Sequence, residues 1–312
     1  MTLHSGTYAE VDLTPRVSVI LLNWNGYHDT AACLSSLRHL RYGNYEVTVV
    51  DNGSTNDSAS RLRDNHPWVK LIETGRNLGF AGGCNVGIGY ALAHGADFVW
   101  LLNNDTVVDG HALQAMVETA QSDPLIGAVG SAIYSMDEPA SIQAWGGGYV
   151  NFWLGRSRHF LKQVPDHSIE FITGASLLIS RAAIESIGLL DEEFFMYWED
   201  ADFCFRLRHA KWRLAVAGQS KVWHKSSASV GNKSARMDAY FNASAASFFQ
   251  KHAPMPTFST WVGGLLRLTK RAIRGDWERT RAVWAGITQR STRQAMVGCE
   301  MPTEASARSV LR

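Results

Sequence analysis

Residues 17–26 read VSVILLNWNG, a short β-branched and apolar run that leads directly into a polar turn. An apolar run of this length, bounded by a turn, is typical of a strand buried in a sheet. Asp29 or Thr30 follows as a candidate cap for a helix with apolar residues on one face. The stretch therefore predicts a strand followed by a helix.

The same unit recurs along the next hundred residues. The further candidate strands are 46–50, 69–72 and 97–102, and the helices expected after them are 58–65, 80–94 and 111–121. Alternating strands and helices predict parallel strands joined by right-handed crossovers. We therefore expect an α/β fold with a mostly parallel central sheet.

A polar tract follows each of these strands. The tracts are 23–26, 51–54, 76–79 and 103–105. Ligands of an open α/β sheet bind in the crevice beyond the carboxyl ends of the strands, so the tracts should meet at one edge. That edge is the predicted active site.

The second half of the chain has a different pattern. Residues 144–158, rich in glycine and aromatic residues, predict an irregular hairpin or loop. An apolar run at 170–180 is followed by a short helix from Arg181 and by an acidic segment, 191–208, that enters a helix. Residues 213–217 and 221–224 are two short strand candidates.

Composition narrows the function classes. The 312 residues carry 30 Lys and Arg against 29 acids, which argues against a nucleic-acid partner. The four cysteines form no C-x-x-C pair, so we expect reduced thiols in a cytoplasmic protein. The first 16 residues lack the pattern of a signal peptide, and no apolar run approaches the ~18 residues of a membrane span.

The C-terminal segment is locally basic. Residues 254–312 hold 10 Lys and Arg against 4 acids, and residues 261–290 predict basic amphipathic helices. Two interpretations stay open: peripheral contact of residues 255–312 with the inner face of the cell membrane, or a solvated helix packed on the domain. The last dozen residues are expected to be disordered.

The first two tracts that suit a nucleotide also have structural interpretations. In DNGS, 51–54, the carboxylate can accept hydrogen bonds from a base or sugar, but the sequence is also an ordinary turn. Residues 76–83, RNLGFAGG, open a helix whose N–H groups and guanidinium could face a diphosphate, although its small residues could simply allow tight helix packing. The dinucleotide fingerprint should follow the first strand, where NWNG stands instead, and this weakens the case for an oxidoreductase.

Two further groups suggest metal and proton chemistry. Asp105 in LLNNDT suits Mg²⁺ or Mn²⁺, which often take one or two protein carboxylates, although it could equally cap a helix. Six acids lie among aromatic residues between Asp191 and Asp202, where partial desolvation favours a basic carboxylate over simple helix-dipole pairing. His224 ends a strand that should return to the metal side of the crevice.

Together these motifs resemble the inverting family 2 glycosyltransferases of the GT-A fold, over about residues 17–252. VSVILLNWNG, DNGS, RNLGFAGGCNVG and LLNNDT are similar especially to rhamnosyltransferases that use dTDP-L-rhamnose. The resemblance implies a Rossmann-like nucleotide-sugar-binding half at 17–130 and an acceptor-binding half at 131–252. An N-terminal extension at 1–16 and a basic helical segment at 253–312 would flank them.

The resemblance also implies residue roles. Asp105 is the metal ligand of a D-x-D-like motif, with His224 at a position where related galactofuranosyltransferases bind the metal. Asp200, next to Glu199, is the expected catalytic base. The acceptor side comprises Thr173, Gly174, Ala175 and Trp198. The donor side comprises Asn23, Trp24, Asn25, Asp51, Gly53, Ser54, Arg76, Asn77, Gly79, Asn85, Asn103 and Asn104.

The implied reaction transfers a sugar to a hydroxyl of a glycan or lipid-linked glycan, with Mg²⁺ or Mn²⁺ as cofactor. Asp200 would take the hydroxyl proton, and the metal and Arg76 would stabilise the departing diphosphate. Other donors stay open, among them UDP-galactofuranose, UDP-GlcNAc and UDP-Glc. An NAD-dependent oxidoreductase and a non-catalytic sugar-nucleotide-binding module are the rival functions.

Overall fold

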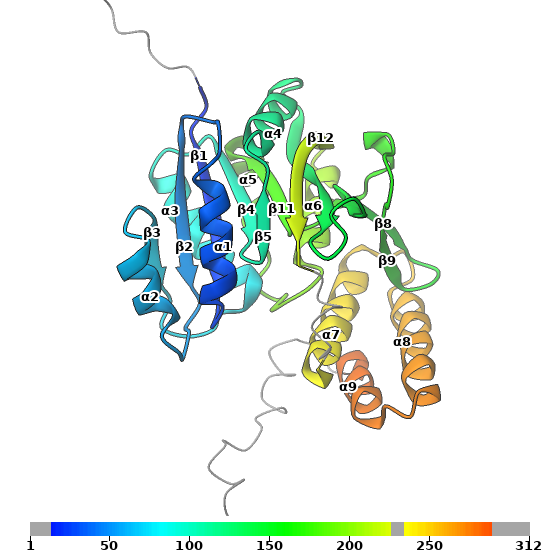
Figure 1. Ribbon diagram of the computed structural model, residues 1–312. Helices are drawn as coiled ribbons and strands as arrows, with labels where there is room; N and C mark the ends of the chain where they lie inside the picture. The colour runs from blue at the N-terminus through cyan, green and yellow to red at the C-terminus, as the bar shows by residue number, and fades with distance from the viewer. Residues whose placement is uncertain (1–13, 226–233, 289–312) are drawn as a thin grey trace, which may run out of the picture.

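The computed structural model describes residues 14–225 and 234–288 (Figure 1). The predicted extension at 1–16 therefore lies almost wholly outside the described residues, as does the expected disorder of the last dozen. A nine-stranded sheet forms the centre, in the order β3-β2-β1-β4-β11-β6-β12-β5, with β7 paired to β6.

The first half of the sheet is parallel, as the alternating pattern predicts. β1 (Val17–Asn23), β2 (Tyr45–Asp51), β3 (Lys70–Glu73) and β4 (Phe98–Asn103) pair in parallel. The helices between them are α1 (Tyr27–Leu37), α2 (Ser58–Asn65) and α3 (Gly79–Ala93). The predicted strand–helix units are thus confirmed within a few residues.

Beyond β4 the sheet is mixed. β11 (Ser176–Ser180) runs antiparallel between β4 and β6 (Ile126–Ser135), and β12 (Arg213–His224) is parallel to β6. β5 (Thr106–Val108) and β7 (Ile142–Trp145) are also antiparallel to their neighbours. The expectation of a mostly parallel sheet therefore applies to the half built from strand–helix units.

The two core clusters explain the strand patterns. Val19 and Leu21 of β1 face α1 and α4 (Ala112–Gln121), whereas Ile20 faces α3. α5 (Arg181–Ile187) and α6 (Glu199–His209) contribute to the same cluster as α3. Because helices cover both faces, the strands are apolar on both sides.

The hairpin predicted for the second half is present, and one strand prediction there needs correction. Residues 142–159 form strands: β8 (Gly147–Asn151) and β9 (Arg156–His159) make a hairpin that joins β10 (Phe171–Ile172) in a second sheet. A Cβ at Gly147 would overlap the Phe171 carbonyl, so this glycine permits close strand pairing. Residues 213–224 are one strand, β12, whose register shifts between Ala217 and Lys221, and not two.

Three helices follow the sheet. α7 (Ala235–His252), α8 (Pro256–Ile273) and α9 (Trp277–Thr288) pack together as a bundle below the β8–β9 hairpin in Figure 1. The helical C-terminal extension is thus confirmed. Among the described residues, none of the helices has the length and apolar content needed to cross a bilayer.

Candidate active site

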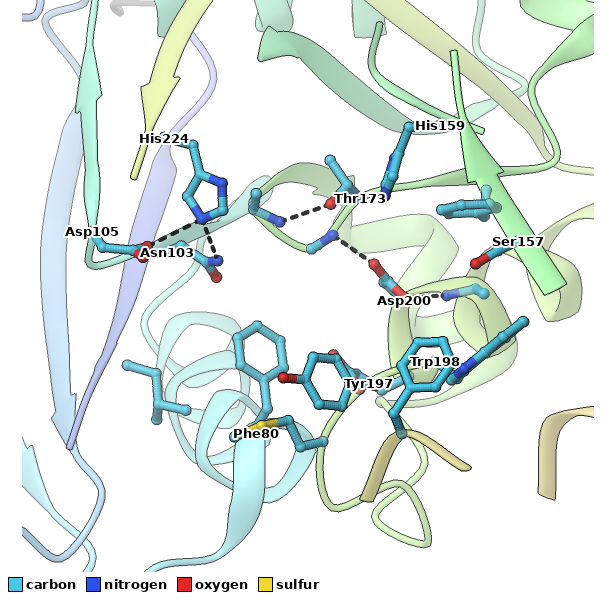
Figure 2. Close-up of a pocket in the computed structure, with 18 of the residues that line it drawn as sticks. Phe80, Asn103, Asp105, Ser157, His159, Thr173, Tyr197, Trp198, Asp200 and His224 are labelled. Carbon is cyan, nitrogen blue, oxygen red and sulfur yellow. Dashed lines mark hydrogen bonds and ion pairs between the residues drawn. The ribbon is translucent and has the colours of Figure 1, made fainter. Parts of the chain in front are cut away.

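A cavity of about 420 Å³ lies where β4 and β12 end, opposite the first turn of α6 (Figure 2). One wall carries Asp105 and His224, and the other carries Thr173 and Asp200. The predicted residues that line it are Asn103, Asn104, Asp105, Thr173, Gly174, Ala175, Trp198, Glu199, Asp200 and His224. Segments separated by about a hundred residues are therefore brought to one site.

Strand pairing places Asp105 beside His224. β5 pairs with the end of β12 in a register that sets Thr106 opposite His224. The Asp105 carbonyl accepts a hydrogen bond from the Lys225 backbone N–H at 3.0 Å. As a result, Oδ1 of Asp105 lies 3.2 Å from Nε2 of His224.

Gln143 of β7 holds the His224 ring, and sequence reasoning missed it. Its Oε1 lies 3.2 Å from Nδ1, and its Nε2 donates to the His224 carbonyl at 3.1 Å. When Nδ1–H donates to Gln143, Nε2 carries the lone pair and faces Asp105. No local signal marks Gln143, because it lies 81 residues from His224 in the sequence and the two meet only when β7 and β12 both pair with β6.

This wall fits a divalent cation held by few protein atoms. Among residues 14–225 and 234–288, no three His, Cys, Asp or Glu side chains gather around one point. Asp105 and His224 supply two possible metal ligands, the carboxylate oxygen and Nε2. Nδ2 of Asn103 lies 3.3 Å from Nε2 of His224. Mg²⁺ is commonly bound through one or two carboxylates, with waters and substrate phosphates completing its shell.

Asp200 is held at the opposite wall by backbone donors. Its Oδ2 accepts a hydrogen bond from Gly174 N–H at 2.8 Å, and its Oδ1 from Ala201 N–H at 2.7 Å. Burial raises the pKa of Asp200, and the two backbone hydrogen bonds oppose that rise. The result is an oriented carboxylate whose proton affinity exceeds that of a solvated aspartate.

Glu199 differs from its neighbour. Burial and the charge of Asp200 raise the pKa of Glu199 well above its ordinary value of 4.5. Its Oε2 has no hydrogen-bond partner among the described residues. A carboxyl group in this setting favours its neutral form, so Asp200 is the better candidate for the base.

The backbone before α6 is strained. Tyr197 and Trp198 both have φ of 69°, in the left-handed region that costs a non-glycine residue roughly 1–3 kcal/mol. The Trp198 ring packs on Phe248 and Phe249 of α7, with centroids 4.8 and 5.3 Å apart. This packing maintains the bend that delivers Asp200 into the cavity from the first turn of α6.

His159 of β9 is a second residue that sequence reasoning missed. It lines the cavity near Asp200, as Figure 2 shows. Loss of solvation lowers the pKa of His159, and the negative charge of Asp200 opposes this change. Its place depends on the β8–β9 hairpin, for which the sequence predicts either an irregular hairpin or a loop.

The turns that follow β1, β2 and β3 carry the other predicted donor-side residues, and these turns lie together but outside this cavity. Asp51 is 2% exposed, and its carboxylate accepts hydrogen bonds from Asn23 at 2.7 Å and from the Ser54 hydroxyl at 2.6 Å. Gly53, with φ of +71°, packs so closely on Arg76 that a Cβ would lie 2.5 Å from its backbone. Asp51 thus stabilises the turn, and its predicted contact with the nucleotide stays a prediction, whereas Arg76 is exposed.

Among the remaining donor-side residues, Trp24 is exposed to solvent, and the others stabilise turns. Trp24 is 47% exposed, and Asn25 accepts a hydrogen bond from Thr55 N–H at 2.8 Å. Asn77 accepts from Gly79 N–H at 2.8 Å at the start of α3. A Cβ on Gly79, whose φ is +78°, would overlap Phe195, so this glycine allows the acidic segment to approach.

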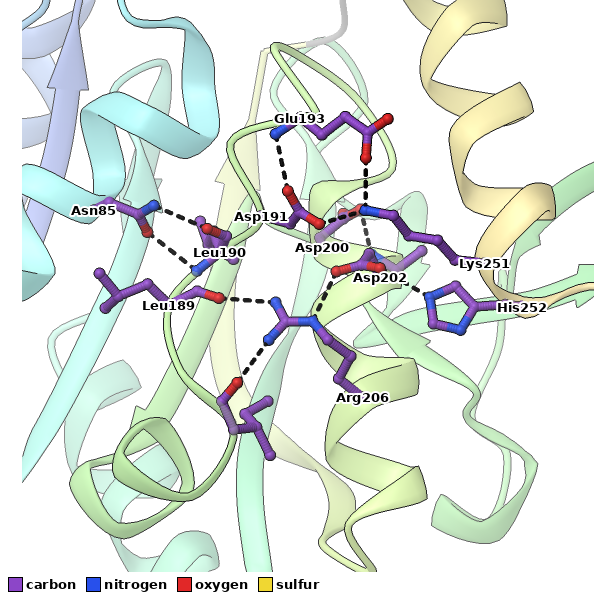
Figure 3. A network of polar contacts seen from close by, with 12 residues as sticks. Asn85, Leu189, Leu190, Asp191, Glu193, Asp200, Asp202, Arg206, Lys251 and His252 are labelled. Carbon is purple, nitrogen blue, oxygen red and sulfur yellow. Dashed lines mark hydrogen bonds and ion pairs between the residues drawn. The ribbon is translucent and has the colours of Figure 1, made fainter. Parts of the chain in front are cut away.

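Asn85, predicted on the donor side, makes structural contacts. Its amide donates to the Leu190 carbonyl at 2.9 Å and accepts from Leu190 N–H at 3.1 Å (Figure 3). Asn85 also donates to Glu192 at 3.1 Å and does not line the cavity. It therefore anchors the segment that leads into α6, and its predicted contact with the nucleotide-sugar stays a prediction.

Asp202 holds the other side of that segment. Its buried carboxylate accepts hydrogen bonds from Arg206 and from His252 of α7, each at 2.8 Å. Arg206 in turn donates to the carbonyls of Ile187 and Leu189 at 3.0 and 2.8 Å (Figure 3). Lys251 pairs with Asp191 and Glu193. Together with Glu192, which Asn85 binds, four of the six acids of the run therefore make structural contacts.

Solved structures share this architecture. The chain resembles a mannosyltransferase from Pyrobaculum calidifontis, solved with GDP-Man and Mn²⁺, with a TM-score of 0.54 and 17% identity over 95% of this chain and 79% of that one. It also resembles GalNAc-T7, solved with UDP, GalNAc and Mn²⁺, with a TM-score of 0.63 and 12% identity over 87% of this chain and 55% of that one. Both neighbours are GT-A glycosyltransferases, and the chain has the GT-A fold.

Sequence similarity then identifies the family. The model described as "Glycosyl transferase family 2" matches residues 18–188, more than half of the chain, and the chain belongs to this family. The low-salt glycan biosynthesis hexosyltransferase Agl10 of Haloferax volcanii is 30% identical over 205 residues, 62% of this chain and 61% of that protein. The N-acetylglucosaminyl-diphospho-decaprenol L-rhamnosyltransferase of Mycobacterium tuberculosis is 28% identical over 210 residues, which are 59% of this chain and 68% of that protein.

Proposed function

We propose that this chain transfers a sugar, with inversion, from a nucleotide-diphospho-sugar to a hydroxyl of a glycan or lipid-linked glycan. The observation that carries the proposal is the pairing of Asp105 and His224 on one wall of a single cavity with Asp200 on the other. A cavity of about 420 Å³ is large enough for an activated monosaccharide between these walls.

Asp200 acts on the acceptor. Its carboxylate, oriented by Gly174 N–H, removes the proton of the acceptor hydroxyl while that oxygen bonds to the anomeric carbon. The bond from the anomeric carbon to the diphosphate breaks, the nucleoside diphosphate leaves, and the proton stays on Asp200. Attack opposite the leaving group inverts the anomeric configuration.

Asp105 and His224 would hold Mg²⁺ or Mn²⁺ on the donor side. A divalent ion held there would supply positive charge to neutralise the departing diphosphate. Gln143 orients the His224 ring for this task. Arg76 does not line the cavity, so its predicted contact with the diphosphate stays a prediction.

The preferred donor is dTDP-L-rhamnose, because a family relative is named as an L-rhamnosyltransferase. UDP-sugars such as UDP-galactofuranose, UDP-GlcNAc or UDP-Glc are the alternative, and the neighbour GalNAc-T7 was solved with UDP. The name of the mycobacterial relative includes a lipid diphosphate sugar, which supports a lipid-linked acceptor. Phe80, Tyr197 and Trp198 provide an aromatic wall for the apolar face of a sugar.

A donor screen tests the proposal. The full-length chain is incubated with dTDP-L-rhamnose and with each UDP-sugar, in Mg²⁺, Mn²⁺ or EDTA, and release of nucleoside diphosphate is measured. We expect release from one donor, loss of release in EDTA, and loss in Asp105→Ala. Sugar-nucleotide binding without release would indicate a non-catalytic module, and binding of NAD(H) with no affinity for dTDP or UDP would indicate an oxidoreductase.

A further inference from the structure

One face of α8 is apolar and largely exposed, although α8 belongs to the helical bundle. Phe258, Trp261, Leu265, Leu268 and Ala272 recur at the three- and four-residue spacing of one helix face. Phe258, Trp261 and Leu265 are 41%, 37% and 52% exposed, and the flanking Leu266 and Ile273 are 51% and 80% exposed. We use the term outer face for these seven residues.

The opposite face of α8 makes the packing contacts and carries the charge. Gly263 and Gly264 abut Gly155 and Ile287 so closely that a Cβ at either glycine would overlap them. Arg267 donates to Asn242 at 2.6 Å, and Arg271 pairs with Asp238 at 3.0 Å. A helix in a water-soluble bundle normally buries its apolar stripe, so α8 has the reverse arrangement.

The apolar surface extends beyond α8. Trp261 contacts Trp284 of α9, with ring centroids 5.9 Å apart, and Phe258 contacts Trp153 of the β8–β9 hairpin at 5.8 Å. Trp284 and Trp153 are 51% and 69% exposed. A contiguous apolar patch of this kind marks an interaction site.

Charge at the edge of the patch indicates its partner. Lys270, Arg274 and Arg281 are exposed, and none has an acidic partner among the described residues. Glu278 is the exposed acid nearby. Tryptophan and leucine on one face, bordered by free cations, suit the interface of an anionic bilayer.

We propose that the outer face of α8, with Trp153 and Trp284, docks on an anionic phospholipid surface. The β8–β9 hairpin joins this surface to the cavity, because its tip carries Trp153 and its second strand carries Ser157 and His159 into the cavity wall. Docking therefore brings the acceptor side of the cavity to the membrane. This last step rests on the proposed transfer to a lipid-linked acceptor, whereas docking itself does not.

Vesicle flotation of the full-length chain tests the proposal without donor, metal or turnover. We expect binding to phosphatidylcholine vesicles that contain phosphatidylglycerol, weaker binding to phosphatidylcholine alone, and a decrease as salt is raised. Brominated phosphatidylcholine should quench the tryptophan fluorescence. Leu265→Glu should lower the partition coefficient at least about tenfold, the effect of removing one buried leucine contact.

Leu125→Glu is the matched control, because Leu125 is 55% exposed and lies outside the helical bundle, before β6. It should bind vesicles as the unaltered chain does. Nucleoside diphosphate binding in solution should be unchanged in both variants, which separates failure of docking from failure of the proposed function.

Three outcomes would overturn the proposal. One is absence of binding to anionic vesicles at low ionic strength. Another is a Leu265→Glu variant that binds as the unaltered chain does, which would assign binding to another segment. The third is a dimer in solution that Leu265→Glu dissociates without affecting vesicle binding, which would make a second copy the partner.

Discussion

Among single residues, Asp200 has the environment best suited to proton transfer. Two backbone N–H groups hold its carboxylate, and burial raises its pKa. Oε2 of Glu199, one residue away, has no hydrogen-bond partner in the described part of the chain. Adjacent carboxyl groups thus differ because one side chain meets the Gly174 backbone and the other enters the core.

Asp200→Asn should lower turnover by about 10²- to 10⁴-fold, because general-base assistance is worth about that much. Nucleotide affinity should stay nearly unchanged. In the unaltered enzyme kcat/KM should rise with pH through the raised pKa of Asp200, because the base must be ionised, and the residual rate of the variant should lack this rise. Steady-state kinetics over pH measure both effects. Near-normal turnover of Asp200→Asn would remove Asp200 from the role.

Gln143 is expected to act through His224. Gln143→Leu removes both hydrogen bonds to His224 and should weaken Mn²⁺ affinity about 10- to 100-fold, as loss of a metal ligand's supporting hydrogen bond typically does. Electron paramagnetic resonance titration of free Mn²⁺ measures this without turnover. Gln114→Leu, on the exposed surface of α4, is the control. Equal Mn²⁺ affinity in Gln143→Leu and the unaltered chain would contradict the assignment.

At the scale of elements, the position of α6 depends on buried polar contacts. Asp202 links α6 to α7 through His252 and orients Arg206, which holds the chain before the acidic segment. Asn85 fixes the same segment from α3. The first turn of α6, and with it Asp200, is therefore located from three directions.

Asp202→Asn should destabilise the fold by about 3–5 kcal/mol at neutral pH, because it leaves buried partners of a carboxylate uncompensated. Hydrogen bonds from His252 and Arg206 lower the pKa of Asp202 below its ordinary value of 3.8. Its contribution is therefore present above that value and is lost as pH falls through the lower folded-state pKa. Urea unfolding at several pH values measures the difference.

The exposed pair Asp57–Arg61 provides the comparison for this prediction. Asp57→Asn breaks a surface contact of 3.9 Å and should cost less than about 1 kcal/mol. An Asp202→Asn penalty as small as this, or one that persists unchanged below the folded-state pKa, would show that the network contributes little.

At the scale of the molecule, the cavity joins two structurally different halves. Asp105 follows a parallel strand of the first half, whereas Asp200 belongs to a helix after the second sheet. A ligand that contacts both walls binds only the folded arrangement. Ligand binding should therefore stabilise the whole domain.

Nucleoside diphosphate with Mn²⁺, at about 100 times its Kd, should add about 2.7 kcal/mol of stability. For a domain of this size that corresponds to an increase in Tm of roughly 5–10 °C. Thermal unfolding with dTDP or UDP measures the shift, and EDTA or Asp105→Ala should reduce it. A shift of equal size in EDTA would exclude a metal-linked site at Asp105.

The sequence alone determined the strand–helix units, the polar ends of their strands and the family, because these follow from local periodicity and short motifs. It also predicted that Asp105 and His224 would lie at one edge of the sheet, since strand ends converge there, whereas the role of Asp200 came from the family resemblance. Tertiary structure alone decided the mixed second half of the sheet and the hydrogen bonds between Gln143 and His224. It also decided the anchoring role of Asn85 and the exposure of the apolar face of α8. Each of these depends on which distant side chains pack together, and local sequence periodicity does not specify such pairings.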